Sequence, residues 1–218
     1  MIPAESQAFE AEYKPRFLDL WKRNATAPAA AIAERSWSCL MTHFSEPHRF
    51  YHNHGHLRHC LRELDGAADQ IGNADVVEMA LWFHDAIYDA GADDNEERSA
   101  RLFESFAQRM LNPQLLREVR DAILDTVHKT LPESENARFV VDIDLSSFGL
   151  PWEEFMADSH DLRKEQMQFS DQEFYRRKCD FLKSLIDRNT IYATSYFRNR
   201  YEAAARTNIE RYLNFMQK

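Results

Sequence analysis

The chain has 218 residues, 44% of them hydrophobic, and is long enough to bury one sizeable core. Only 5 glycines and 7 prolines interrupt it, which argues against an all-β or loop-rich protein. Its net charge of −9 argues against a nucleic-acid groove, because phosphate backbones are bound by clustered lysine and arginine.

The cysteines and the N-terminus indicate the cellular setting. Cys39, Cys60 and Cys179 are widely spaced and form no CxxC pair, which is typical of reduced thiols in a cytosolic protein. The first residues are acidic, where a signal peptide would be basic and then apolar. No run approaches the ~18 apolar residues of a membrane span. We therefore expect a soluble, cytoplasmic protein; a homo-oligomer stays open.

Helical periodicity dominates the N-terminal half of the chain. We expect a first helix beyond Pro15 and a second one opened by Pro28, since proline suits a first helical turn. Leucines at three- and four-residue spacing predict a third helix around residues 57–64. A compact and strongly apolar helix is expected over residues 76–87.

The C-terminal half continues the same pattern. Asp93 or Asp94 is placed to cap a further helix, and Pro113 starts another. A short apolar helix around VVDIDLSSF follows the polar loop LPESEN, and Pro151 starts a long amphipathic tail. The charge-rich stretch DLRKEQ in this tail has the composition of a solvated helix face. No strand-like alternation, repeat or linker is present, so we expect a single all-α domain over residues 1–218. An irregular bundle is favoured over a coiled coil, because no heptad persists.

Two short stretches concentrate the residues that carry chemistry. YHNHGHLRHC, residues 51–60, holds four of the nine histidines, although a lone histidine is usually an ordinary core or surface residue. His84 and Asp85 lie inside the apolar stretch LWFHDAIYD, where an unpaired buried carboxylate would be costly. Imidazole and carboxylate are good ligands for divalent metal ions, so a metal is a suitable partner. Asp142 and Asp144 lie in the apolar stretch VVDIDL, where a buried carboxylate would need a partner for the same reason.

The order of these residues resembles a known ligand pattern. A histidine, then an HD dipeptide, then an aspartate on a later helix is similar to the pattern of the HD superfamily of all-α, metal-dependent phosphohydrolases. YHNHGHL, LWFHDAIYD, DNEERSA, TVHKT and VDIDLSSFG resemble successive blocks of its predicted small HD-type phosphohydrolase branch. The resemblance covers about residues 37–149, and the helices of residues 151–218 follow the branch more loosely.

The resemblance implies a ligand set. His56, His84, Asp85 and Asp142 would hold a divalent ion, one of Mn, Mg, Co, Ni, Fe or Zn. Residues two apart on a helix point about 200° apart, so only one of Asp142 and Asp144 can face the ion. The first acid of such a DxD pair is the ligand in similar proteins, so Asp142 is preferred. Asp144 would then cap a helix, bond a group that supports the ligands, or face solvent.

Six further residues are candidates for a role in the site, and each of them also has a plainer structural explanation. Asp89 is a candidate base for the attacking water, or a simple loop acid. His128 would act in catalysis, by binding phosphate or a second metal. Alternatively, it is a histidine that the helix dipole favours at the end of a helix. His52, Asn53 and Lys129 would bind substrate, and Glu96 would hold a ligand histidine, or these residues are ordinary surface and helix-opening residues. His54 and His59 are expected at the surface.

The function expected from the resemblance is hydrolysis of a small phosphorylated substrate, a phosphate ester or a nucleotide. In the 5′-nucleotidase branch a glutamate follows the HD histidine by four residues; Tyr88 stands there in this chain, which argues against a simple transfer of that activity. Two alternatives stay open: a non-catalytic module that binds metal or nucleotide, and a di-iron oxygenase with His52, His128 and Asp89 as extra ligands.

Overall fold

The fold is entirely helical. The computed structural model describes residues 4–216, and this part of the chain contains helices and no strand, which confirms the all-α prediction. None of the helices within it has the length and apolar composition needed to cross a membrane. The α-helices are α1 (Ala4–Asn24), α2 (Ala30–Phe44), α3 (His54–Ala67), α4 (Ala74–Phe83), α5 (Asn95–Ala107), α6 (Pro113–Asp125), α7 (Glu135–Asp144), α8 (Trp152–Glu165), α9 (Asp171–Ile186) and α10 (Ser195–Met216), with short 3-10 helices η1 (Ala68–Gln70) and η2 (Leu145–Gly149).

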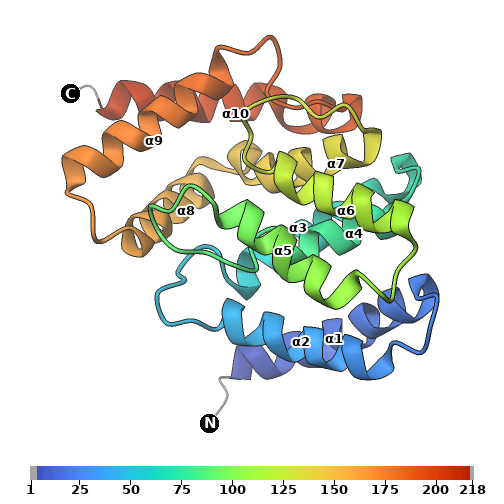
Figure 1. The fold of residues 1–218 in the computed structure, drawn as a ribbon. Helices are drawn as coiled ribbons and strands as arrows, with labels where there is room; N and C mark the ends of the chain where they lie inside the picture. Colours follow the sequence, from blue (N-terminus) through green and yellow to red (C-terminus); the bar gives the residue numbers. More distant parts are fainter. Residues whose placement is uncertain (1–3, 217–218) are drawn as a thin grey trace.

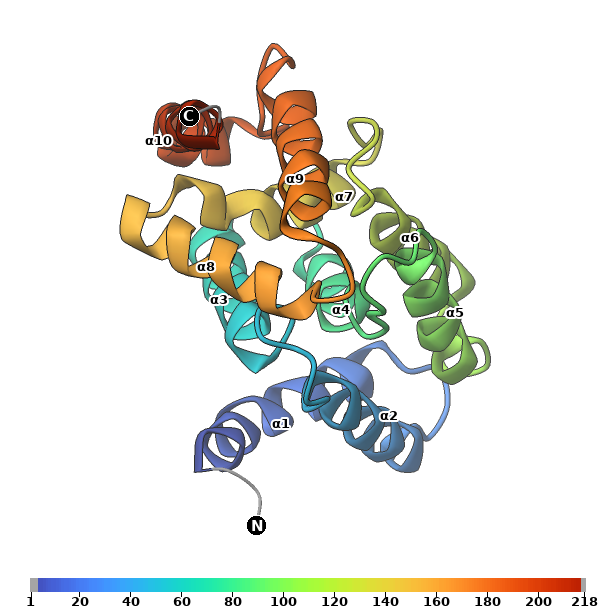
Figure 2. The same ribbon diagram turned by 90° about the vertical axis from the view of Figure 1, so that its left-hand side faces the viewer.

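Helix α4 is the centre of the molecule. Every residue from Val76 to Phe83 is buried, including Glu78, whose carboxylate binds Arg16 at 2.8 Å. A helix that is apolar on all sides needs neighbours on all sides. Accordingly α1, α3, α5, α6 and α7 all pack against α4. In both views α1 and α2 lie at one end of the molecule, and α9 and α10 lie at the other (Figures 1 and 2).

The first helix begins earlier than the sequence predicts. Helix α1 starts at Ala4 and contains Pro15 in its interior. The buried rings of Phe9 and Tyr13 pack near the indoles of Trp37 and Trp82, with centroid distances of 6.3 Å. Burial of two aromatic side chains, at about 2 kcal/mol each, offsets the ~3 kcal/mol cost of an interior proline.

Helix α4 ends just before the HD dipeptide, four residues earlier than expected from the apolar run to Ile87. His84 is its C-cap residue, and its ring Nδ1 lies 2.9 Å from the Leu81 carbonyl oxygen. The chain beyond turns away toward α5, where the buried Ser99 hydroxyl accepts from the Ile87 N–H at 3.0 Å. The end of α4 therefore places His84 and Asp85 in a turn rather than on a helix face.

Candidate metal centre

Four side chains from three helix ends converge on one point. His56 lies in the first turn of α3, His84 and Asp85 follow the end of α4, and Asp144 is the last residue of α7. The Nε2 atoms of His56 and His84 are 3.3 Å apart. Asp85 Oδ2 lies 3.4 Å from the first and 3.1 Å from the second. Asp144 Oδ1 lies 3.2 Å and 3.5 Å from the same two nitrogens.

Local structure orients these ligand atoms. Because the Leu81 carbonyl accepts from Nδ1 of His84, that nitrogen carries the proton and Nε2 presents its lone pair to the cluster. Helices α4 and α7 both end here, and the carbonyl end of a helix favours positive charge. Two carboxylates and two helix C-termini thus create a site for a cation.

The spacing of the four atoms fits a single ion. Ligands at right angles on an ion, with bonds of roughly 2.0–2.4 Å, lie about 2.8–3.4 Å apart. Apart from the Asp85–Asp144 pair, the separations here are 3.1–3.5 Å. Asp85 Oδ2 is also a buried oxygen that lacks a hydrogen-bond partner among the described residues. An unsatisfied buried oxygen between two imidazoles is what a cation would satisfy.

The shifted pKa values of the cluster fit a site that favours a cation. Burial would lower the pKa of His84, yet the carboxylates of Asp85 and Asp144 raise it well above the usual 6.5. Burial would raise the pKa of Asp144, but hydrogen bonds from His128, His56 and His84 hold it well below its ordinary value. Without another cation, protons on the imidazoles balance the carboxylates. A metal ion that binds here must displace those protons.

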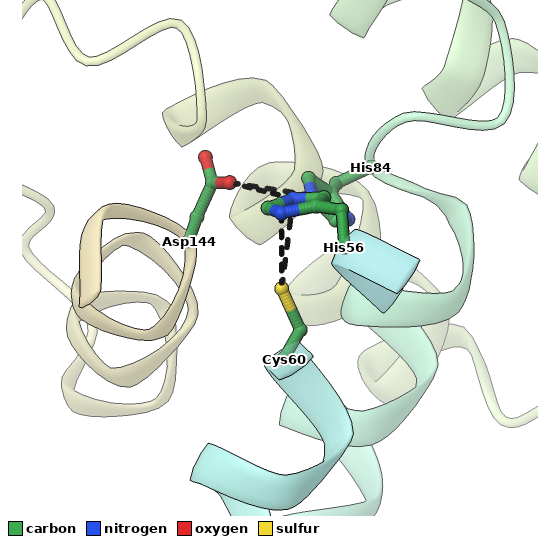
Figure 3. A group of neighbouring side chains, drawn as sticks. All are labelled: His56, Cys60, His84 and Asp144. Atoms are coloured by element: carbon green, nitrogen blue, oxygen red, sulfur yellow. Dashed lines mark hydrogen bonds and ion pairs between the residues drawn. The ribbon is translucent and has the colours of Figure 1, made fainter. Parts of the chain in front are cut away.

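Cys60 is a neighbour that the sequence did not single out. It lies one turn after His56 on α3, and its Sγ atom is 3.6 Å from His56 Nε2 (Figure 3). The ligand atoms of His56, Cys60, His84 and Asp144 all lie within 4.8 Å of one another, so this group can hold a metal ion. The only sequence signal was the four-residue spacing from His56, which places both side chains on one helix face.

Asp142 does not join the cluster, contrary to the prediction. Its buried carboxylate accepts hydrogen bonds from the backbone N–H groups of Ala193 and Thr194, both at 2.7 Å, and from the Thr194 hydroxyl at 2.6 Å. Burial raises its pKa to about 6, although these bonds oppose the shift. Only one acid of the pair faces the cluster, as helical geometry requires, and it is Asp144. Asp142 anchors the loop that enters α10.

His128 touches Asp144 from the other side. Its Nε2 lies 2.7 Å from Asp144 Oδ2, so the imidazole N–H donates to the oxygen that faces away from His56 and His84. Its backbone φ of +57° lies in the left-handed region, which non-glycine residues seldom adopt. Arg188 donates to the carbonyl oxygen of His128 and helps to hold it there. Its predicted catalytic role is untested, but its position beside Asp144 is that of a site residue.

His52 is held by a buried acid, Glu165, which stands in a stretch whose composition predicts a solvated helix face. Glu165, within the stretch DLRKEQ, is only 4% exposed. It accepts from the N–H groups of Tyr51 and His52 at 2.8 Å, and its other oxygen lies 2.6 Å from His52 Nδ1. The His52 ring stacks on Tyr88, with centroids 4.1 Å apart. The sequence lacked a signal for Glu165, because it stands in a run of charged residues, of which Lys164 is exposed.

Three other predicted residues lie outside this arrangement. The Asp89 side chain is exposed and pairs with Arg98 at 2.5 Å. Asn53 is the N-cap of α3, where its side chain accepts from the Gly55 N–H at 2.7 Å. Lys129 is exposed, and none of the three lines the cavity described next. The predictions of Asp89 as a base and of Asn53 and Lys129 as substrate ligands are therefore corrected. Asp89 and Lys129 are surface residues, and Asn53 is a capping residue.

A cavity of about 370 Å³ opens onto the cluster, within the usual range for small-molecule sites. One side, here called the inner wall, carries Asp85 and Asp144. The rest of the lining, here called the outer wall, comes from η2, α8, α9 and Gln166, which follows α8. The inner wall comprises Tyr51, His52, Asp85, Glu96, Thr126, Val127, His128 and Asp144. The outer wall comprises Leu145, Ser147, Phe148, Phe155, Asp158, Ser159, Leu162, Gln166, Phe174, Arg177, Lys178, Phe181 and Leu182.

Glu96 lies on the inner wall, at the start of α5. Burial raises the pKa of its carboxyl group, and the nearby charges of Asp85 and Asp144 raise it further. Its predicted support of a ligand histidine stays a prediction, whereas its place on the cavity makes it available to a bound molecule.

Comparison of the chain with protein-family models, curated proteins and solved structures finds no match to any of them.

Proposed function

We propose that the protein is a metal-dependent phosphohydrolase of the HD type. The observation that carries the proposal is the convergence of two imidazoles and two carboxylates on one point at the wall of a cavity. The same residues carry the resemblance to the HD superfamily, with Asp144 in the place assigned to Asp142. His56, His84, Asp85 and Asp144 are the proposed ligands.

The proposed ion is divalent. Two carboxylates and two neutral imidazoles leave a charge of −2, which a divalent ion balances. A nitrogen and oxygen ligand set suits Mn, Mg, Co, Ni, Fe or Zn and selects poorly among them. Such an ion supplies charge neutralisation for a phosphoryl group and lowers the pKa of a water molecule. Cys60 is left out of the proposed ligand set, although it lies in the same group, because the resemblance to the HD superfamily assigns Asp85, and no thiolate, to the ion.

The protein residues supply orientation and a proton. Glu165 fixes Nδ1 of His52, as the acid of a catalytic triad fixes its histidine, and leaves Nε2 for a group in the cavity. In the proposed reaction a water oxygen bonds to phosphorus while the ester P–O bond breaks. The leaving oxygen takes a proton from His52 and departs as an alcohol, the protons of the water stay on the inorganic phosphate, and one of them then returns to His52. His128 keeps Asp144 in place through its 2.7 Å contact.

The di-iron oxygenase has less support. It needs further ligands beside the first ion, and Asp89, one of the three expected, faces away from the cavity and pairs with Arg98. His52 is also engaged by Glu165.

The test combines metal analysis with product analysis. Purified protein is stripped with EDTA, reconstituted with each candidate ion, and assayed for inorganic phosphate release from aryl phosphates, nucleoside monophosphates and cyclic nucleotides. We expect one ion per chain, no release without metal and restored release with at least one redox-inert ion. Full activity in protein shown to be metal-free by elemental analysis would refute the proposal, and two irons per chain with oxygen consumption would favour the oxygenase.

A further inference from the structure

Two cations line the outer wall, Arg177 and Lys178. The Arg177 side chain is exposed and lies over the ring of Phe169, whereas Lys178 is part-buried. The Lys178 ammonium, on α9, donates to the Ser159 hydroxyl at 2.5 Å. It lies 4.8 Å from the ring centroid of Tyr212 and 5.8 Å from that of Phe155. Asp158 acts on it through space, but among the residues of the described chain it forms no ion pair with a carboxylate.

This arrangement leaves the charge of Lys178 incompletely satisfied. An ammonium group has three N–H donors, and Ser159 takes only one of them. Burial lowers the pKa of Lys178 to about 7, which reflects the cost of a charge without a partner. Since Lys178 and Ser159 both line the cavity, an anion bound in the cavity has access to the two remaining N–H donors of Lys178.

The outer wall also has an apolar part that is largely aromatic, formed by Leu145, Phe148, Phe155, Leu162, Phe174, Phe181 and Leu182. Its other polar residues are Ser147, Asp158, Gln166 and Arg177. Aromatic rings of this kind pack against flat apolar groups. The lining of one cavity therefore includes two carboxylates of the cation-binding cluster, an apolar surface and an ammonium group.

We propose that the substrate is a phosphate monoester of a flat, apolar group that carries a second anionic group, and that Lys178 binds this second anion. The inference rests on the proposed hydrolase function, which assigns the phosphate ester to the inner wall. It goes beyond that function by naming the body of the substrate and the residue that selects it.

Matched probes isolate the second anion. 2-Naphthyl phosphate has the ester and the flat body, 6-(phosphonooxy)-2-naphthoate adds a carboxylate, and naphthalene-2,6-diyl bisphosphate replaces the carboxylate with a phosphate. A charged hydrogen bond contributes about 1.5–3 kcal/mol, so we expect the metal-loaded protein to show a KM about 10- to 100-fold lower for the anionic probes than for 2-naphthyl phosphate. The better of the two anionic probes identifies the second anion as carboxylate or phosphate.

Variants on one helix assign the effect to Lys178. Lys178→Met should bring the KM ratio of the probes close to one, and Lys178→Arg should restore most of the preference. Lys183→Met, an exposed position on the same helix, should leave the ratio unchanged. Circular dichroism of each variant reports folding. Equal KM values in the unmodified protein, or a preference that survives in folded Lys178→Met, would overturn the inference.

A binding assay separates this inference from the hydrolase function. The products 6-hydroxy-2-naphthoate and 2-naphthol are titrated against the protein by their fluorescence, without turnover. Tighter naphthoate binding that Lys178→Met abolishes supports the anion site even if no ester is hydrolysed, in which case the hydrolase proposal alone fails. Hydrolysis of all probes with no dependence on Lys178 leaves the function standing and contradicts the anion site.

Discussion

The two walls of the cavity are built in different ways. The inner wall presents side chains from helix ends and turns, and two of the ligands beside it are held from outside the cluster, His84 by the Leu81 carbonyl and Asp144 by His128. The outer wall presents side chains from the faces of α8 and α9, with Lys178 held only by Ser159 and aromatic rings. The inner wall is pre-organised for one chemical task, whereas the outer wall is suited to selecting a molecule.

This difference makes distinct predictions for changes on each side. Inner-wall substitutions should remove metal or turnover for every substrate. Outer-wall substitutions should change the ranking of substrates. The following experiments test that division, beginning with the largest expected effect.

Asp85→Asn should cause the greatest loss. It removes a negative charge and the unpaired oxygen that lies 3.1 Å from His84 Nε2. We expect metal retention after dialysis and phosphate release to fall together by more than the ~10- to 100-fold typical of residues that only support a ligand. Elemental analysis and initial rates measure both. Asp89→Asn is the matched control, and an equal loss there would contradict the assignment.

Glu165→Gln tests whether His52 needs its buried acid. The hydrogen bond from His52, with two backbone N–H groups, lowers the pKa of Glu165 against the opposing effect of burial. Without this anion, Nδ1 of His52 loses the partner that orients the ring, and we expect kcat to fall about 10- to 100-fold while the metal stays bound. The acidic or basic limb of the pH–rate profile should move as well. A variant with normal kcat and an unchanged profile would make Glu165 purely structural.

His59 provides a pH test of the region behind the inner wall. It was expected at the surface, but its Nε2 lies 2.7 Å from the buried Ser146 hydroxyl, and burial lowers its pKa to about 4. Between pH 6.5 and about 4 the unfolded chain binds more protons here than the folded chain, so stability is present above pH 6.5 and is lost as the pH falls. We expect this residue to contribute about 2 kcal/mol to that loss. Urea unfolding of His59→Gln should show a correspondingly shallower pH dependence; an identical slope would contradict it.

Asn53→Ala should have the smallest effect. Loss of a helix N-cap costs about 1 kcal/mol, and in a chain of this length the melting temperature should fall by about 2–4 °C. KM for phosphate esters should not change, because the side chain does not line the cavity. A large rise in KM without a change in melting temperature would restore Asn53 as a substrate ligand.

The sequence was informative where chemistry is concentrated in short stretches. Apolar periodicity placed most helices, and the HD dipeptide and the histidine cluster marked His56, His84 and Asp85, which do converge. Helical geometry also showed that one acid of VVDIDL must turn away. It could not say which, because the phase of α7 depends on a loop 51 residues away that binds Asp142.

The outer wall was not predictable for a related reason. Phe174 and Leu182 were recognisable as buried, but a buried aromatic residue of a core and one of a cavity have the same periodicity. Lys178 and Glu165 stand among exposed charged residues, and only their contacts with α8 and the start of α3 distinguish them. Residues that act through distant partners have no local signature.

Metal stoichiometry in Asp144→Asn and Asp142→Asn tests the central claim most directly. Both substitutions are isosteric, and they lie two residues apart on α7. We predict that Asp144→Asn loses the ion while it remains folded, and that Asp142→Asn keeps one ion per chain but unfolds more easily, because it no longer accepts all three hydrogen bonds from Ala193 and Thr194. Retention of the ion by Asp144→Asn together with its loss from folded Asp142→Asn would contradict the site.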